Sequence, residues 1–236
     1  MRHDHDDGKS AQFDQYADSY TDLHRSSIAA SGEEPAYFSA YKADYMAARG
    51  SSDRSIGSIL DFGCGVGNSI PHLRAAFPSA TIHGCDPSGE SIAVAESKFG
   101  NVAQFNAVAS SMLPYPDGAF DLVLVACVLH HIPVLERQAW MSEIHRVTRP
   151  GGRVFVFEHN MLNPVTRKVV RDCPFDEDAV FLPRKEVLGL ARGSGFSSVV
   201  ARYVVFFPRP LAALRGLEPM LGWLPLGAQY VVMADA

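Results

Sequence analysis

The chain has 236 residues, of which 47% are hydrophobic and 20% are charged, so its composition is that of an ordinary globular protein with a buried core. Its formal net charge is −5 and no run of lysine or arginine exceeds a pair, which argues against a nucleic-acid partner. No apolar stretch reaches the roughly 18 residues of a membrane helix, and the first ten residues lack the apolar core of a signal peptide. We therefore expect a cytoplasmic protein without membrane insertion.

Residues that could bind a metal are present but poorly placed. The four cysteines are widely spaced and form no CxxC pair, which indicates reduced thiols rather than a disulfide framework or a zinc site. His3 and His5 stand among aspartates near the N-terminus, where no apolar pattern would anchor them. The sequence therefore predicts no metal site.

The N-terminal segment predicts a helical cap. Its two helices are expected over residues 12–20 and 34–49. In the first of them the aromatic residues Tyr16 and Tyr20 recur at about helical spacing, which fits either a buried stripe or a lid over a binding site. We expect residues 1–52 to cover a main domain formed by residues 53–236.

Strand and helix patterns alternate through the main domain, which is typical of a parallel sheet with helices on both faces. Strands are predicted at residues 58–62, 81–85, 103–106, 122–126, 153–157, 198–207 and 229–234. Helices are predicted at residues 69–76, 89–98, 135–147 and 183–192. Pro150, Gly151 and Gly152 predict a turn into the fifth strand.

The most informative motif is ILDFGCGVGNS, which ends the first strand. In it Asp61 is followed by glycines at alternate positions, namely Gly63, Gly65 and Gly67. Glycine allows a tight turn and a close approach of the backbone to a ligand. The second strand ends in Asp86, where a carboxylate can accept hydrogen bonds from both ribose hydroxyls of an adenosine.

The spacing of this loop distinguishes between adenosine cofactors. The dinucleotide pattern GxGxxG needs a glycine where this chain has Asn68, and its pyrophosphate needs bare amides with no carboxylate nearby. Asp61 is a poor neighbour for that anion. S-adenosylmethionine instead carries a cationic sulfonium and an ammonium group, which an acidic loop favours.

At this point the chain resembles the class I S-adenosylmethionine-dependent methyltransferases. The resemblance extends to LPYPDGAFDLVLVACVLHHI and EIHRVTRPGGRVFVFE, and it covers residues 58–158 in four ordered motifs. It implies a doubly wound α/β fold with a mostly parallel, seven-stranded Rossmann-like sheet whose last strand is antiparallel. It also implies S-adenosyl-L-methionine as the cofactor and a small-molecule acceptor as the partner.

The resemblance and the loop chemistry together imply a set of cofactor-binding residues at the carboxyl ends of the strands and in the cap. These are Asp61, Gly63, Gly65, Gly67, Asn68, Asp86, Pro87, Ser110, Ser111, Met112, Cys127, Tyr16 and Tyr20. One position departs from the family pattern, because Ala109 stands where many relatives have an acidic residue that contacts adenine. Adenine would then be contacted by a serine hydroxyl or by the backbone.

Histidines at the same edge of the sheet are the candidate catalytic residues. Methyl transfer needs alignment of the acceptor above all, and an oxygen or ammonium acceptor must also lose a proton, a role that suits histidine. His131 follows the fourth strand and His159 follows the fifth, and we favour His159 as the base. If side chains alternate as in a strand, only one of His130 and His131 faces the cleft. The alternative is that these histidines serve in packing or at a helix start.

Two segments suggest how the acceptor is held. Residues 158–183 form a polar insertion after the fifth strand, where a substrate pocket is commonly built, or else a solvated loop. Residues 208–228 form an apolar excursion that would be buried as a cap over the substrate or as a homodimer contact.

The polar insertion favours O- or N-methylation of a small polar metabolite, including a sugar-linked one. The apolar excursion favours the alternative of C-methylation of a lipid or quinone. A binding protein that keeps the cofactor but has lost catalysis is a further possibility, as is a nicotinamide oxidoreductase, against which the Asn68 spacing argues.

Overall fold

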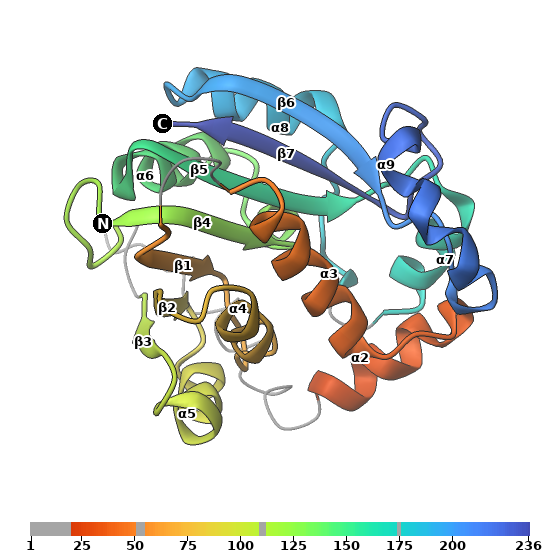
Figure 1. The fold of residues 1–236 in the computed structure, drawn as a ribbon, viewed down its shortest axis with the longest axis horizontal. Coiled ribbons are helices and arrows are strands. Elements are labelled where there is room, and N and C mark those ends of the chain that lie inside the picture. The colour runs from red at the N-terminus through yellow and green to blue at the C-terminus, as the bar shows by residue number, and fades with distance from the viewer. Residues whose placement is uncertain (1–19, 51–54, 109–111, 174–175) are drawn as a thin grey trace.

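The protein folds around one seven-stranded sheet with helices on both faces, seen here in a computed structural model (Figure 1). The structure describes residues 20–50, 55–108, 112–173 and 176–236. The strands are β1 (Ser58–Phe62), β2 (Thr81–Asp86), β3 (Gln104–Ala107), β4 (Phe120–Ala126), β5 (Thr148–His159), β6 (Ser197–Val204) and β7 (Gln229–Asp235).

The strand order is β3-β2-β1-β4-β5-β7-β6. The first five strands in this order pair in parallel, whereas β7 is antiparallel to both of its neighbours, β5 and β6. This topology confirms the predicted Rossmann-like fold with an antiparallel last strand. The order also reverses at β1 and β4, which is where ligands bind in open α/β sheets.

Helices form two layers, and the apolar faces of α3 and α4 cover one side of the sheet while those of α6 and α8 cover the other (Figure 1). The helices are α2 (Tyr20–Ile28), α3 (Pro35–Ala47), α4 (Ile70–Ala76), α5 (Gly89–Phe99), α6 (Arg137–Val147), α7 (Pro164–Arg171), α8 (Arg184–Gly193) and α9 (Glu218–Leu221). Short 3₁₀ helices cover Ala29–Ser31, Leu129–His131 and Arg209–Leu217. Among the described residues, no helix is both long and apolar enough to cross a membrane.

Local chemistry explains where several elements begin. The central strand β4, with sequence FDLVLVA, is buried up to its last residue, as expected for a strand covered on both faces. Helix α5 starts after Ser88, whose hydroxyl accepts a hydrogen bond from the Ser91 amide. Helix α7 starts after Asn163, whose side chain accepts hydrogen bonds from two amides of the first turn, and Pro164 occupies the first helical position.

The start of β5 differs from the sequence-based expectation. We expected Pro150 to Gly152 to form a turn before the strand, but these residues lie inside β5. The pairing of β4 with β5 shifts its register here, and Gly151 adopts a φ of 77°, which a glycine tolerates at little cost. The Gly151 amide donates a hydrogen bond to the Ala236 carbonyl, so the irregular segment stays attached to the C-terminus.

The ends of the chain also refine the expectations. The predicted helix 34–49 is confirmed as α3. Of the predicted helix 12–20, only residue 20 belongs to the described residues. Helix α2 was not expected. The polar insertion contains helix α7, and the apolar excursion forms a 3₁₀ helix and α9. Large apolar side chains of the excursion remain exposed, namely Leu211, Leu214, Leu217, Met220, Trp223 and Leu226. A homodimer contact there stays a prediction.

Candidate functional site

One cavity of about 510 Å³ lies at the carboxyl ends of β1, β2, β4 and β5. Its volume is within the roughly 300–1,000 Å³ typical of pockets for small molecules. Residues from the α2–α3 region, from α7 and from the segment after β6 also line it. We call the part around Asp61 and Asp86 the glycine-loop end, and the part around His130, His131, His159 and Asp176 the histidine end.

The glycine loop has the backbone that its sequence predicts. Gly63, Gly65 and Gly67 have φ values of 74°, 50° and 81°, a region that other residues rarely adopt. A methyl group added at Gly63 would stand 2.5 Å from the Val128 side chain, so this glycine permits close packing. At Gly65 it would meet no atom within 4 Å, and Gly65 lines the cavity. The loop therefore presents bare backbone to the open space.

Asp86 connects the loop with the second strand. Its Oδ2 accepts a hydrogen bond of 2.8 Å from the Gly65 amide, and its Oδ1 accepts one of 2.9 Å from the Ser88 amide. These bonds fix the carboxylate at the end of β2. Because a carboxylate oxygen has two lone pairs, a hydrogen bond from one amide does not prevent it from also accepting one from a ribose hydroxyl.

Asp61 is buried at the same end and has an unused acceptor. Its Oδ2 has no hydrogen-bond partner among the described residues, although the side chain is almost fully buried. Burial raises the pKa of Asp61 to about 7, and the nearby Asp86 charge adds to the effect. A cationic ligand would supply the missing partner. This observation fits the ammonium group of S-adenosylmethionine.

Three residues that the sequence analysis missed also suggest a bound ligand. The Tyr37 hydroxyl and Gln229 Oε1 are buried without a hydrogen-bond partner among the described residues, and both residues line the cavity. Lys42 of α3 is 7% exposed, lines the cavity and lies 5.8 Å above the ring of Phe157. In the sequence, Lys42 stands among residues that are buried in α3, which is unusual for a lysine. Its position at the cavity could not be predicted, because it depends on how α3 packs on the sheet.

The other predicted cofactor residues fall into three groups. Asn68, Pro87 and Cys127 line the cavity, and Cys127 has a φ of 59°, an unfavourable conformation of the kind found at functional sites. Gly67 and Met112 are not among the described residues that line it. Tyr16, Ser110 and Ser111 lie outside the described residues, as does Ala109, and Tyr20 begins α2 without a described side chain. Their roles stay predictions.

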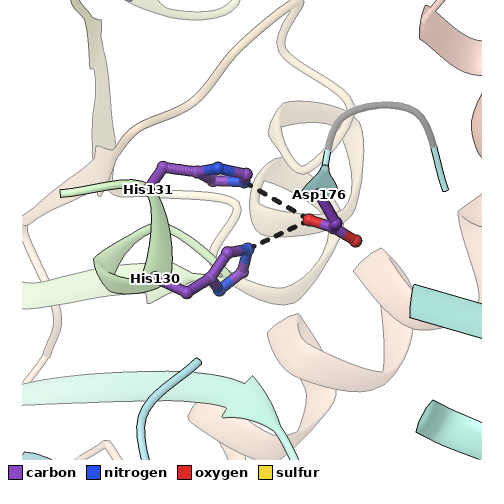
Figure 2. Close-up of side chains that lie close together, drawn as sticks. All are labelled: His130, His131 and Asp176. Atoms are coloured by element: carbon purple, nitrogen blue, oxygen red, sulfur yellow. Dashed lines mark ion pairs between the residues drawn. The ribbon is translucent and has the colours of Figure 1, made fainter. Parts of the chain in front are cut away.

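The histidine end contains a buried group of charges centred on His130. His130 Nδ1 lies 2.6 Å from Glu158 Oε2, and the other oxygen of Glu158 accepts a hydrogen bond from the Leu129 amide. On the opposite side of the ring, His130 Nε2 lies 3.3 Å from Asp176 Oδ1. His131 Nε2 lies 3.6 Å from the same oxygen, so both rings converge on Asp176 (Figure 2).

This convergence shows that one expectation was wrong. We expected strand-like alternation to turn only one of the two histidines into the cleft, but they stand in a 3₁₀ helix, Leu129–His131. Consecutive residues of such a helix are about 120° apart rather than opposite. Both histidines line the cavity.

The charges of the group are strongly coupled. Burial alone would lower the pKa of His130, but Glu158 and Asp176 outweigh it and raise this pKa to about 10. Burial and the His130 charge lower the pKa of His131 to about 3 and that of His159 to about 4. At neutral pH, His130 is therefore a cation between two carboxylates, while His131 and His159 are neutral and can accept a proton.

Asp176 reaches the site because the insertion is anchored to the segment after β4. The Val180 amide donates a hydrogen bond to the His130 carbonyl, and Arg137 donates one to the Val180 carbonyl. The ring of Phe181 stacks on His130 with centroids 5.0 Å apart. These contacts join residues 43 to 51 positions apart, which explains why sequence analysis alone did not place Asp176 beside the histidines.

Comparison with known proteins agrees with this geometry. Residues 60–156 match the family model described as a methyltransferase domain. The demethylmenaquinone methyltransferase of Thermus thermophilus is 34% identical over 103 residues, which are 42% of this chain and 46% of that protein. The ajmaline N-methyltransferase of Rauvolfia serpentina is 25% identical over 147 residues, or 56% of this chain and 50% of that protein. The matched regions thus span about half the length of these relatives.

Solved structures extend the likeness in fold to almost the whole chain. A methyltransferase structure from Thermotoga maritima, described as a possible histamine N-methyltransferase, has a TM-score of 0.66 at 18% identity, covering 96% of this chain and 99% of that one. At this identity the likeness concerns the fold alone. Together with the matched domain, the glycine loop and the orphan carboxylate of Asp61, these comparisons show that the chain carries a methyltransferase domain of the class I, S-adenosylmethionine-dependent family.

Proposed function

We propose that the chain is a methyltransferase that uses S-adenosyl-L-methionine to methylate an oxygen or nitrogen atom of a small polar metabolite, a class that includes sugar-linked compounds. One observation carries the choice of acceptor. The cavity that contains Asp61 and Asp86 also contains the charged and neutral imidazoles of the histidine end. A polar acceptor that reached this end could replace lost water contacts with hydrogen bonds to these groups.

The glycine-loop end would hold the cofactor. Asp86 would accept hydrogen bonds from the ribose hydroxyls, and Asp61 would form an ion pair with the ammonium group. Gly65 has no side chain and would let the loop approach the ligand closely. When bound, S-adenosylmethionine supplies a methyl group on a cationic sulfur, and the sulfur keeps the bonding electron pair as the methyl leaves. Asn68, Pro87 and Cys127 would complete the walls of this end.

The histidine end would align the acceptor and take its proton. His159 lines the cavity as a neutral imidazole, so we assign it as the base that accepts the proton of a hydroxyl as the new bond to carbon forms, or the proton of an ammonium group before the bond forms. His131, also neutral, would orient the acceptor. The α2–α3 segment also lines the cavity and would exclude water as part of the proposed cap of residues 1–52.

A second candidate is C-methylation of a quinone or another apolar acceptor. Two observations favour it, the partial likeness to demethylmenaquinone methyltransferases and the exposed apolar side chains of residues 209–226. The wall of the cavity also includes the apolar residues Trp140, Phe206 and Phe207. A protein that binds the cofactor without catalysis is a further alternative, which a measured turnover would exclude.

The experiment is a screen of small acceptors with cofactor that carries a ¹³C-labelled methyl group. We expect a product whose labelled methyl has the NMR shift of an ether or an amine methyl. A label on a ring carbon would support the second candidate instead. Binding of S-adenosylhomocysteine without turnover of any acceptor class would favour the non-catalytic alternative.

A further inference from the structure

We propose that His130, His131 and Asp176 form a binding site for one first-row divalent metal ion, such as Mn²⁺ or Zn²⁺. The three side chains lie close together (Figure 2), and all three line the cavity at its histidine end. The sequence offered no spacing that indicates such a site, because the three residues come together only through the fold of the insertion.

The distances suit ligands of a common ion. The Oδ1 atom of Asp176 lies 3.3 Å from His130 Nε2 and 3.6 Å from His131 Nε2, and all three atoms lie within 4.8 Å of one another. Ligands that bind one ion at about 2.1 Å are separated by about 3.0–3.4 Å in tetrahedral or octahedral geometry. The two distances to Asp176 lie in or close to that range, and rotation of the two imidazole rings would bring their Nε2 atoms, which lie within 4.8 Å of each other, toward a shared ion.

Glu158 provides the support that a metal-binding histidine usually has. It holds His130 through Nδ1 at 2.6 Å, so the Nε2 atom is directed toward Asp176. The Leu129 amide in turn fixes Glu158. A carboxylate that orients the imidazole through its other nitrogen is a common arrangement around bound metals.

The ligand set indicates which ions would bind and what they would do. Two imidazoles and a carboxylate suit Mn²⁺, Fe²⁺, Co²⁺ or Zn²⁺ better than Mg²⁺ or Ca²⁺, which prefer oxygen ligands. Three protein ligands leave positions open on the side of the cavity, and an oxygen of the acceptor could fill one of them. The ion would then act as a Lewis acid on that oxygen. This role rests on the proposed methyl transfer, but the ion site itself does not.

The same atoms could instead form a purely ionic network. In that interpretation, His130 stays a cation that bridges Glu158 and Asp176, and no ion is needed, whereas a bound ion would displace the proton from His130 Nε2 to solvent. The two interpretations differ in one measurable property, since only a metal site would bind an added ion with defined stoichiometry and be stabilised by it.

The test uses the untagged full chain after treatment with a chelator and removal of the chelator. Mn²⁺ is titrated in the absence of cofactor and acceptor, with free Mn²⁺ followed by electron paramagnetic resonance and the protein followed by thermal unfolding. We expect one bound equivalent and a rise in Tm. Asp176→Asn and His131→Gln should each weaken binding by at least about tenfold and abolish the rise in Tm.

Two controls separate this site from adventitious binding. Asp172→Asn makes the same change at an exposed aspartate of the same segment and should leave Mn²⁺ binding unchanged. A His3→Ala, His5→Ala double variant should also bind one equivalent. The proposal is overturned if the wild-type chain binds no Mn²⁺, or if Asp176→Asn binds Mn²⁺ as tightly as the wild type does. Because neither cofactor nor acceptor is present, either outcome leaves the methyltransferase proposal standing.

Discussion

The glycine-loop end of the cavity is formed largely by backbone from two short segments that are close in the sequence, whereas the histidine end is formed by side chains from three segments far apart. At the first end, Asp86 is held by the amides of Gly65 and Ser88. At the second, Glu158, His130 and Asp176 hold one another through charge. The comparison suggests that the geometry of the glycine-loop end follows from the fold, whereas the side chains of the histidine end are specific to the reaction that this chain catalyses.

The first prediction tests whether the two ends act separately, and it has the largest expected effect. His159→Ala should lower kcat by about 10²–10⁴-fold, the usual contribution of a general base, while the affinity for S-adenosylhomocysteine stays unchanged. Steady-state kinetics across the pH range and a binding titration measure the two quantities. His145→Ala, on α6 beside Phe196, is the matched control and should alter neither quantity. Wild-type turnover in His159→Ala at every pH would exclude His159 as the base.

The second prediction concerns the glycine-loop end. Asp86→Ala removes the proposed ribose contact and the acceptor of two loop amides. Loss of hydrogen bonds to a charged group costs about 2 kcal/mol, so the affinity for S-adenosylhomocysteine should fall by about 30-fold. Asp117→Ala, at an exposed carboxylate, serves as the control. If the affinity of Asp86→Ala equals that of the wild type, the ribose does not bind at the end of β2.

The third prediction is smaller and concerns the charge of Asp61. Its pKa in the free protein is about 7, raised by burial and by Asp86, so ionisation is unfavourable there until a cation binds. Because Asp61 holds its proton more tightly in the folded state than in the unfolded state, its contribution to the free energy of unfolding falls as the pH rises from the unfolded pKa toward 7. A bound ammonium group stabilises the ionised carboxylate and so opposes this loss. The affinity for S-adenosylmethionine should therefore increase with pH below about pH 7, by at most about tenfold per unit, and level off above it.

Calorimetric titrations at a series of pH values check this dependence. Asp61→Asn cannot ionise, so its affinity should be lower above pH 7 and should vary much less with pH. Asp117→Asn should follow the wild-type profile. Equal slopes in Asp61→Asn and the wild type would assign the dependence to another group.

The same contrast explains what could be predicted from the sequence. Local patterns predict much of the fold. Alternating strand and helix patterns indicate a parallel sheet, and closely spaced glycines after a strand indicate a tight turn with positive φ values. Asp86 could be placed for the same reason, since the rule for carboxyl ends of strands needs only the strand boundaries.

The histidine end was less accessible to such reasoning. The pattern LHHI did not reveal a 3₁₀ helix, so the directions of His130 and His131 were misjudged. The position of Asp176 beside the histidines depends on the hydrogen bond between Val180 and His130. The position of Lys42 at the cavity depends on how α3 packs over the sheet. These are tertiary contacts between distant segments, which no periodicity in one segment encodes.

The measurement that tests the central claim most directly is a calorimetric titration of the wild-type chain with S-adenosylhomocysteine and, separately, with NADH. The orphan Oδ2 of Asp61 and the GxGxG loop predict saturable binding of S-adenosylhomocysteine with one site per chain and no binding of NADH. Tight binding of NADH without any response to S-adenosylhomocysteine would contradict the account.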